Sequence, residues 1–109
     1  MEYSINLTAQ AILQIQNTIS YISNVLLAPE TAIKWADYLE KEISKLSNMP
    51  SRFSKLEDEP WFSRGFRKMP IKNFIVYYYI DEINKIVWIT AVIYGKRDQL
   101  NALKNTPLK

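Results

Sequence analysis

Residues 73–94 read NFIVYYYIDEINKIVWITAVIY. β-Branched and aromatic side chains dominate residues 73–80 and 86–94, and a mostly polar segment, residues 81–85, lies between these two runs. This composition is typical of two strands joined by a hairpin loop. We therefore predict an antiparallel strand pair at the centre of the fold.

Both faces of this strand pair are apolar. The first strand alternates Phe74, Val76, Tyr78 and Ile80 with Ile75, Tyr77 and Tyr79, and the second alternates Val87, Ile89, Ala91 and Ile93 with Ile86, Trp88, Val92 and Tyr94. Two helices can cover one face of so small a sheet. The other face must be covered by residues 48–65, by a C-terminal helix or by a partner. We favour a partner, because large apolar patches mark interaction sites.

The first half of the chain has the pattern of a short strand followed by two amphipathic helices. Residues 2–7 alternate polar and apolar side chains, and Thr8 is a suitable helix N-cap. Apolar residues then recur at helical spacing as Ile12, Ile15, Ile19, Ile22 and Leu26, and after Pro29 as Ala32, Trp35 or Ala36, Leu39, Ile43 and Leu46. The tight connection predicts that the two helices form an antiparallel hairpin.

The rest of the chain predicts one domain, residues 1–109, of the α+β class. Residues 48–65 show neither helical nor strand periodicity, and a short strand over residues 66–69 ends at Pro70. Residues 98–103 can form a short helix. The predicted order is an N-terminal strand, an antiparallel helical hairpin, three antiparallel strands and a short C-terminal helix.

Composition excludes several chemistries. Cysteine and histidine are absent, so disulfides, Ser-His and Cys-His dyads and the commonest metal ligands are excluded. We find no long apolar run or signal pattern, and we expect a cytoplasmic protein without a membrane partner. Residues 1–60 carry a net charge of −3 and residues 61–109 one of +6. A basic half favours an anionic partner, either nucleic acid or an acidic polypeptide.

Five local phrases connect the sequence with a known superfamily. They are residues 21–29 (YISNVLLAP), 49–52 (MPSR), 59–67 (EPWFSRGFR), 73–78 (NFIVYY) and 93–98 (IYGKRD). Together with the element order, they resemble the RelE/ParE superfamily of bacterial type II toxin-antitoxin toxins, over nearly the whole chain.

The resemblance implies a toxin that arrests growth until a small, acidic antitoxin neutralises it in a hetero-oligomer. Antitoxins of this kind wrap the toxin, adding a strand or laying a helix in a groove. ParE-like toxins inhibit DNA gyrase, whereas RelE-like toxins are metal-independent endoribonucleases that cleave mRNA on the ribosome. A third alternative is a non-toxic remnant that still binds its antitoxin. No cofactor or metal is implied.

The RelE pattern is matched only in part. Arg97 corresponds to the last-strand arginine, and Arg67 and Lys68 correspond to basic residues of the second strand. Phe74 or Ile75 replaces a further arginine, and the expected C-terminal tyrosine falls near Leu103. These departures favour gyrase inhibition over ribonuclease activity. The candidates for antitoxin or target binding are Trp61, Tyr77, Tyr79, Trp88, Tyr94 and Lys96.

Overall fold

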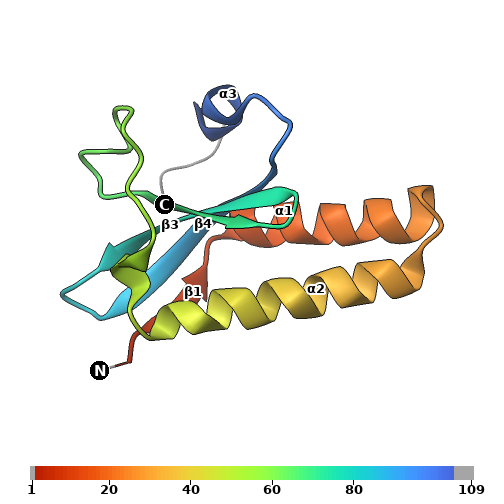
Figure 1. Ribbon diagram of the computed structural model, residues 1–109, viewed down its shortest axis with the longest axis horizontal. Coiled ribbons are helices and arrows are strands. Elements are labelled where there is room, and N and C mark those ends of the chain that lie inside the picture. Colours follow the sequence, from red (N-terminus) through yellow and green to blue (C-terminus); the bar gives the residue numbers. More distant parts are fainter. Residues whose placement is uncertain (1, 105–109) are drawn as a thin grey trace.

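A four-stranded sheet forms the centre of the computed structural model, which describes residues 2–104 (Figure 1). Its strands are β1 (Ser4–Leu7), β2 (Arg67–Ile71), β3 (Phe74–Asp81) and β4 (Ile86–Tyr94), in the spatial order β1-β4-β3-β2. The last three strands are antiparallel, as predicted. β1 pairs with β4 in parallel, so the sheet as a whole is mixed.

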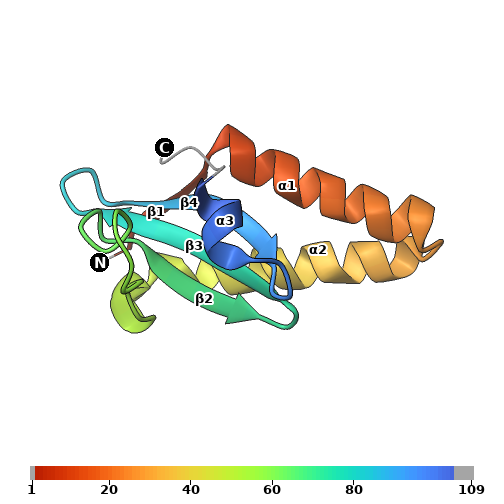
Figure 2. The ribbon, with the colours of Figure 1, turned by 90° about the horizontal axis from the view of Figure 1, so that it is seen from above.

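The predicted helical hairpin is confirmed. It consists of α1 (Ala9–Ser20), a π-helical turn (Tyr21–Val25) and α2 (Pro29–Ser44). The Thr8 hydroxyl caps α1 by accepting from the Ala11 N–H at 3.2 Å, and Pro29 opens α2. Both helices lie on one face of the sheet and their connection projects past it, whereas α3 (Gln99–Lys104) lies on the other face (Figures 1 and 2).

The apolar stripe predicted for the first helix is wrong at both ends. Ala11 is the fully buried residue of α1, and Ile12 and Leu26 are exposed. The small Ala11 side chain allows α1 to approach β4 closely. A π-helical turn contains more residues than an α-helical one, so it rotates Leu26 out of the stripe that contains Ile22. The stripe predicted for α2 is confirmed, with Trp35 buried and Ala36 half-buried.

A β-bulge in β4 changes the predicted face of its last residues. Tyr78 pairs with Ile89 but Tyr77 pairs with Ala91, so Thr90 is an extra residue. Ile89 therefore faces the helices, whereas Ala91 packs on the opposite face. The alternation that placed Val87, Ile89, Ala91 and Ile93 on one face is corrected accordingly.

The chain itself covers the second face of the sheet, which corrects the expectation that a partner does so. The cluster on this face consists of Leu56, Trp61, Phe66, Tyr77, Ala91, Ile93, Ala102 and Leu103. Its covering residues come from the loop before β2 and from α3. The loop within residues 48–65 and the C-terminal helix, which were alternatives, therefore cover this face together.

Strand β2 passes through Pro70 instead of ending there. Pro70 pairs with Ile75, and β2 is an edge strand of the sheet. The Lys68 N–H donates away from β3, to the Ser54 carbonyl. Pro70 has the same orientation as Lys68, so its missing N–H costs no bond to β3.

Removing the Tyr78 hydroxyl tests how firmly the loop after α2 is held. This buried hydroxyl donates to the buried Pro50 carbonyl at 2.6 Å. We expect Tyr78→Phe to lower the free energy of unfolding by about 1–3 kcal/mol, because that carbonyl loses its donor. Urea unfolding measures the change. Tyr79→Phe is the matched control, because the Tyr79 hydroxyl has no hydrogen-bond partner within residues 2–104. Equal losses in both variants would contradict this role.

Candidate functional site

A largely apolar groove of about 780 Å³ lies between the tip of the helical hairpin and the end of β4. It is lined by Gln14, Asn17, Thr18, Tyr21, Ile22, Leu26, Phe74, Val92, Ile93, Tyr94 and Arg97. The pairing of β1 with β4 ends at Leu7 and Ile89. Past that point α1 faces β4, and the Gln14 side chain accepts from the Val92 N–H at 2.7 Å. A helix replaces a strand beside β4, and this leaves room for the groove.

An aromatic row connects the core with the groove. Trp35, buried on α2, contacts Phe74 with ring centroids 5.0 Å apart, and Phe74 contacts the exposed Tyr94 at 5.5 Å. Phe74 and Tyr94 are paired across β3 and β4 and so share the helix-facing side. The Tyr94 ring is thus held in place at the groove wall while remaining accessible.

The turn after β4 fixes the position of Arg97. The Gly95 N–H donates to the Asn73 carbonyl at 2.7 Å, and a Cβ at Gly95 would lie 3.0 Å from that oxygen. The Arg97 N–H donates to the Tyr94 carbonyl, and the Gln99 amide donates to the carbonyls of Tyr94 and Arg97. A residue with a side chain at position 95 would push the two strand ends apart.

Arg97 supplies a positive charge to the groove. Within residues 2–104, no carboxylate forms an ion pair with its guanidinium. Lys96, in the same turn, is exposed. An apolar wall with a cation beside it suits an apolar segment that carries a carboxylate.

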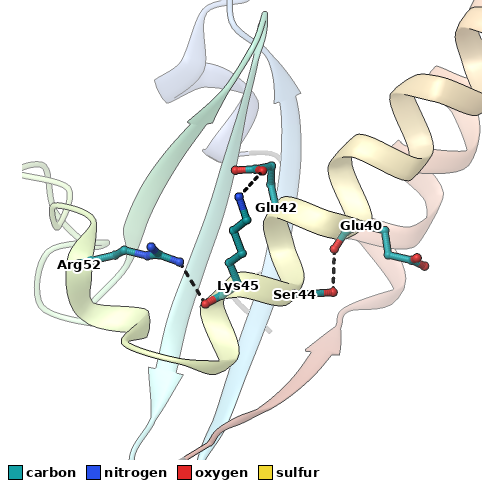
Figure 3. A network of polar contacts seen from close by, with 5 residues as sticks. All are labelled: Glu40, Glu42, Ser44, Lys45 and Arg52. Carbon is teal, nitrogen blue, oxygen red and sulfur yellow. Dashed lines mark hydrogen bonds and ion pairs between the residues drawn. The ribbon is translucent and has the colours of Figure 1, made fainter.

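Arg67 has a different environment, because its guanidinium holds the loop after α2. One terminal nitrogen donates to the carbonyls of Ser51 and Phe53, at 3.1 and 2.6 Å. Arg52 from the same loop donates to the Lys45 carbonyl at the end of α2, at 3.1 Å (Figure 3). These bonds, with that of Tyr78, fasten residues 50–53 to both α2 and the sheet.

The three candidate catalytic residues are not brought together. Arg67 pairs with Tyr78, which faces the helices, whereas Lys68 pairs with Tyr77, which faces α3. Arg97 lies beyond the end of β4. Arg67 is about 13 Å along the sheet from that end, which is four residues of strand. Arg67 and Lys68 therefore lie on opposite faces of the sheet, and Arg97 lies at a different end of it from Arg67.

The buried tyrosines are held as neutral donors. Burial raises the pKa of Tyr77 to about 12, and its hydroxyl donates to the Gln99 side chain at 2.8 Å. Burial likewise raises the pKa of Tyr78 to about 12, against an opposing effect of Arg67 and Arg52. A tyrosine acts as a base only when it is ionised, and these shifts disfavour ionisation near neutral pH.

The candidate binding residues differ in accessibility. Trp61 is only 3% exposed, and Tyr77 is also buried, so both belong to the core beneath α3 and the loop. Tyr79 stacks on Phe66 at 5.4 Å, and Trp88 is half-buried. Tyr94 and Lys96 lie at the surface, Tyr94 in the groove itself.

Sequence reasoning missed the contribution of the hairpin tip to the groove. Tyr21, Ile22 and Leu26 come from the phrase YISNVLLAP, whose pattern predicts the end of a helix followed by a break. The signal in the sequence that could have indicated this is a run of apolar side chains longer than one helical stripe can bury.

The described part of the chain, residues 2–104, contains no helix with the length and apolar character of a membrane span. The same residues contain no group of three or more acidic, histidine or cysteine side chains that could hold a metal.

Three solved structures share the fold. The chromosomal ParDE toxin-antitoxin system from P. aeruginosa matches with a TM-score of 0.71 and 17% identity, over 87% of this chain and 98% of that one. The RelBE2 toxin-antitoxin complex from Mycobacterium tuberculosis matches with 0.62 and 21%, over 86% and 99%. A mutant of the E. coli toxin RelE in the free state matches with 0.60 and 14%, over 94% and 93%.

The sequence identifies a narrower family than the fold does. No curated protein sequence matches the chain significantly. The family model of the ParE toxin of the parDE type II toxin-antitoxin system matches residues 5–99. Because this match spans most of the 109 residues, the chain belongs to the ParE toxin family of type II toxin-antitoxin systems, within the RelE/ParE superfamily.

Proposed function

We propose that this chain is the toxin of a bacterial toxin-antitoxin pair and acts in the cytoplasm by binding and inhibiting DNA gyrase or a similar macromolecular target. One observation carries the choice of a non-catalytic mechanism. Arg97, Arg67 and Lys68 lie at separate places on the sheet, and the Arg67 guanidinium already bonds two backbone carbonyls.

Metal-free RNA cleavage needs a base, an acid and a cation around one phosphate. The cations that the RelE pattern would use are separated, and Tyr77 and Tyr78 donate within the protein with a raised pKa. This arrangement favours the inhibitor over the ribosome-dependent ribonuclease. The match to the ParE model favours it independently.

The antitoxin is proposed to occupy the groove between the hairpin tip and β4. Its segment presents apolar side chains to Ile22, Leu26 and Phe74 and a carboxylate to Arg97. The charge of +6 over residues 61–109 favours an acidic chain as the partner, and Arg97 places one of these cations at the groove. Binding of a flexible acidic segment in an apolar groove follows the general pattern of helix-in-groove recognition.

A supercoiling assay with purified gyrase tests the mechanism directly. We expect the purified chain to inhibit supercoiling, and we expect mRNA to remain intact in a reconstituted translation reaction. Mapping of mRNA 5′ ends measures the second outcome. New ends that appear only with ribosomes would overturn the inhibitor in favour of the ribonuclease. Intact mRNA together with unaffected gyrase and normal growth on induction would identify a non-toxic remnant.

Arg97→Ala tests the cation beside the groove. We expect weaker target inhibition and weaker antitoxin binding, each by at least tenfold, because a charge-assisted contact contributes about 1.5–3 kcal/mol. Supercoiling titrations and calorimetry measure the two effects. Lys85→Ala is the control, because Lys85 lies in the β3–β4 turn and outside the groove. Full activity of Arg97→Ala in both assays would remove Arg97 from the site.

Leu26→Glu tests the apolar wall of the groove. Leu26 is exposed, so a charge there leaves the core intact, but it places a carboxylate where the antitoxin would bury apolar surface. We expect the affinity for the antitoxin encoded beside this gene to fall at least tenfold, since burial of a leucine contributes about 1.5–3 kcal/mol. Ile83→Glu makes the same change at a residue that is 92% exposed and distant from the groove. Equal effects of the two variants would place the antitoxin elsewhere.

A further inference from the structure

The helical hairpin carries charge on only one of its two helices. Residues 3–29 contain no Asp, Glu, Lys or Arg, although charged residues make up 23% of the chain. This stretch includes all of β1, α1 and the π-helical turn. A surface helix ordinarily presents charged side chains to water, so the absence of charge on α1 needs a reason.

The two helices differ most on their solvent faces. On α2 this face carries Glu30, Lys34, Asp37, Glu40 and Lys41. On α1 and the following turn the exposed residues are Ala9, Ile12, Leu13, Gln16, Asn17, Ser20, Tyr21, Asn24 and Val25. They recur every three or four positions and so form one continuous strip along the helix. We call this strip the α1 face.

The composition of the α1 face fits one occupant, a second copy of the chain. A two-fold contact brings each surface against itself, so any charge near its axis meets the same charge on the partner. The α1 face is neutral throughout, so no like charges meet across such an axis in any register. Its apolar residues stand at the two ends, and Gln16 and Asn17, which can both donate and accept, stand in the middle.

We propose that the chain forms a two-fold dimer in which two α1 helices pack antiparallel, with the axis between Gln16 and Asn17. In this register Ile12 of one copy meets Tyr21 of the other, Leu13 meets Ser20, and Gln16 meets Asn17. The side-chain amides then bond each other across the axis, and apolar contacts flank them on both sides. This proposal does not depend on the identity of the target.

The dimer has to be weak. The α1 face runs along α1 and the π-helical turn, residues 9–25, which is about 25 Å of helix. One face of such a helix is smaller than the roughly 800 Å² that each partner of a stable complex buries. We therefore expect a dissociation constant in the micromolar range. Asn17 and Tyr21 belong both to the α1 face and to the groove, so dimerisation and groove binding affect each other.

Sedimentation equilibrium of the purified chain, from about 5 to 500 µM, tests the dimer. We expect the mass to rise towards twice that of the monomer, and Leu13→Glu to weaken association at least tenfold. Leu100→Glu is the matched control, because Leu100 on α3 is 41% exposed and Leu13 is 49% exposed. We expect this control to associate normally. Far-ultraviolet circular dichroism establishes that both variants are folded.

A charge pair tests the register. We expect Leu13→Glu combined with Ser20→Lys to restore association, because residues 13 and 20 meet across the axis in both halves of the dimer. The two positions are seven residues apart in one helix, too far for a pair within a chain. Failure of this rescue would overturn the antiparallel register. A monomer throughout the concentration range would overturn the dimer. A Leu13→Glu variant that associates like the unmodified chain but binds the antitoxin more weakly would also overturn it, and would assign the α1 face to the antitoxin.

Discussion

The extra residue at Thr90 is the constraint on which the arrangement of this fold depends. Its side chain, completely buried, donates to the Tyr77 carbonyl at 3.1 Å, and its own carbonyl accepts from Thr8 at 3.3 Å. The hydroxyl and the carbonyl of Thr90 are thus both hydrogen-bonded although the residue is completely buried, which removes the usual cost of burying a hydroxyl. It lets one strand serve two cores, since Ile89 contacts the helices and Ala91 contacts the layer beneath α3.

The same bulge sets the position of the groove. Thr8 donates its N–H to Ile89, bonds Thr90 and caps α1, so the pairing of β1 ends where the helix begins. The remaining part of β4 then faces a helix, and Gln14 satisfies the Val92 N–H that a strand would have bonded. A bulge next to a binding site is a common way to end pairing and redirect side chains. In this chain it creates the space that Phe74 and Tyr94 line.

Much of the fold could be predicted from the sequence because helix and strand periods are local properties. Thr8, Pro29 and the stripe on α2 follow from capping chemistry and spacing. The faces of β4 could not be predicted, because a bulge at Thr90 leaves no periodic signal and is fixed by contacts with Tyr77 and Thr8. The residues that cover the second face of the sheet could not be predicted either, because they come from segments distant in sequence and a local pattern carries no information about such packing.

The candidate site shows the same limit in its charged residues. Arg67 and Arg97 carry identical charges, and the sequence predicts one catalytic role for both. In the structure Arg67 bonds the carbonyls of a loop, whereas Arg97 lies beside an open groove. The two guanidinium groups differ in the backbone carbonyls that lie near them. The loop at Ser51 and Phe53 offers acceptors that no strand pairs. A guanidinium there gains more from bonding the backbone than from facing water. Arg97 lies in a turn in which two carbonyls, that of Tyr94 and its own, already accept from Gln99. Its guanidinium is therefore left exposed beside the groove, where the acidic segment that we propose for the antitoxin would pair with it.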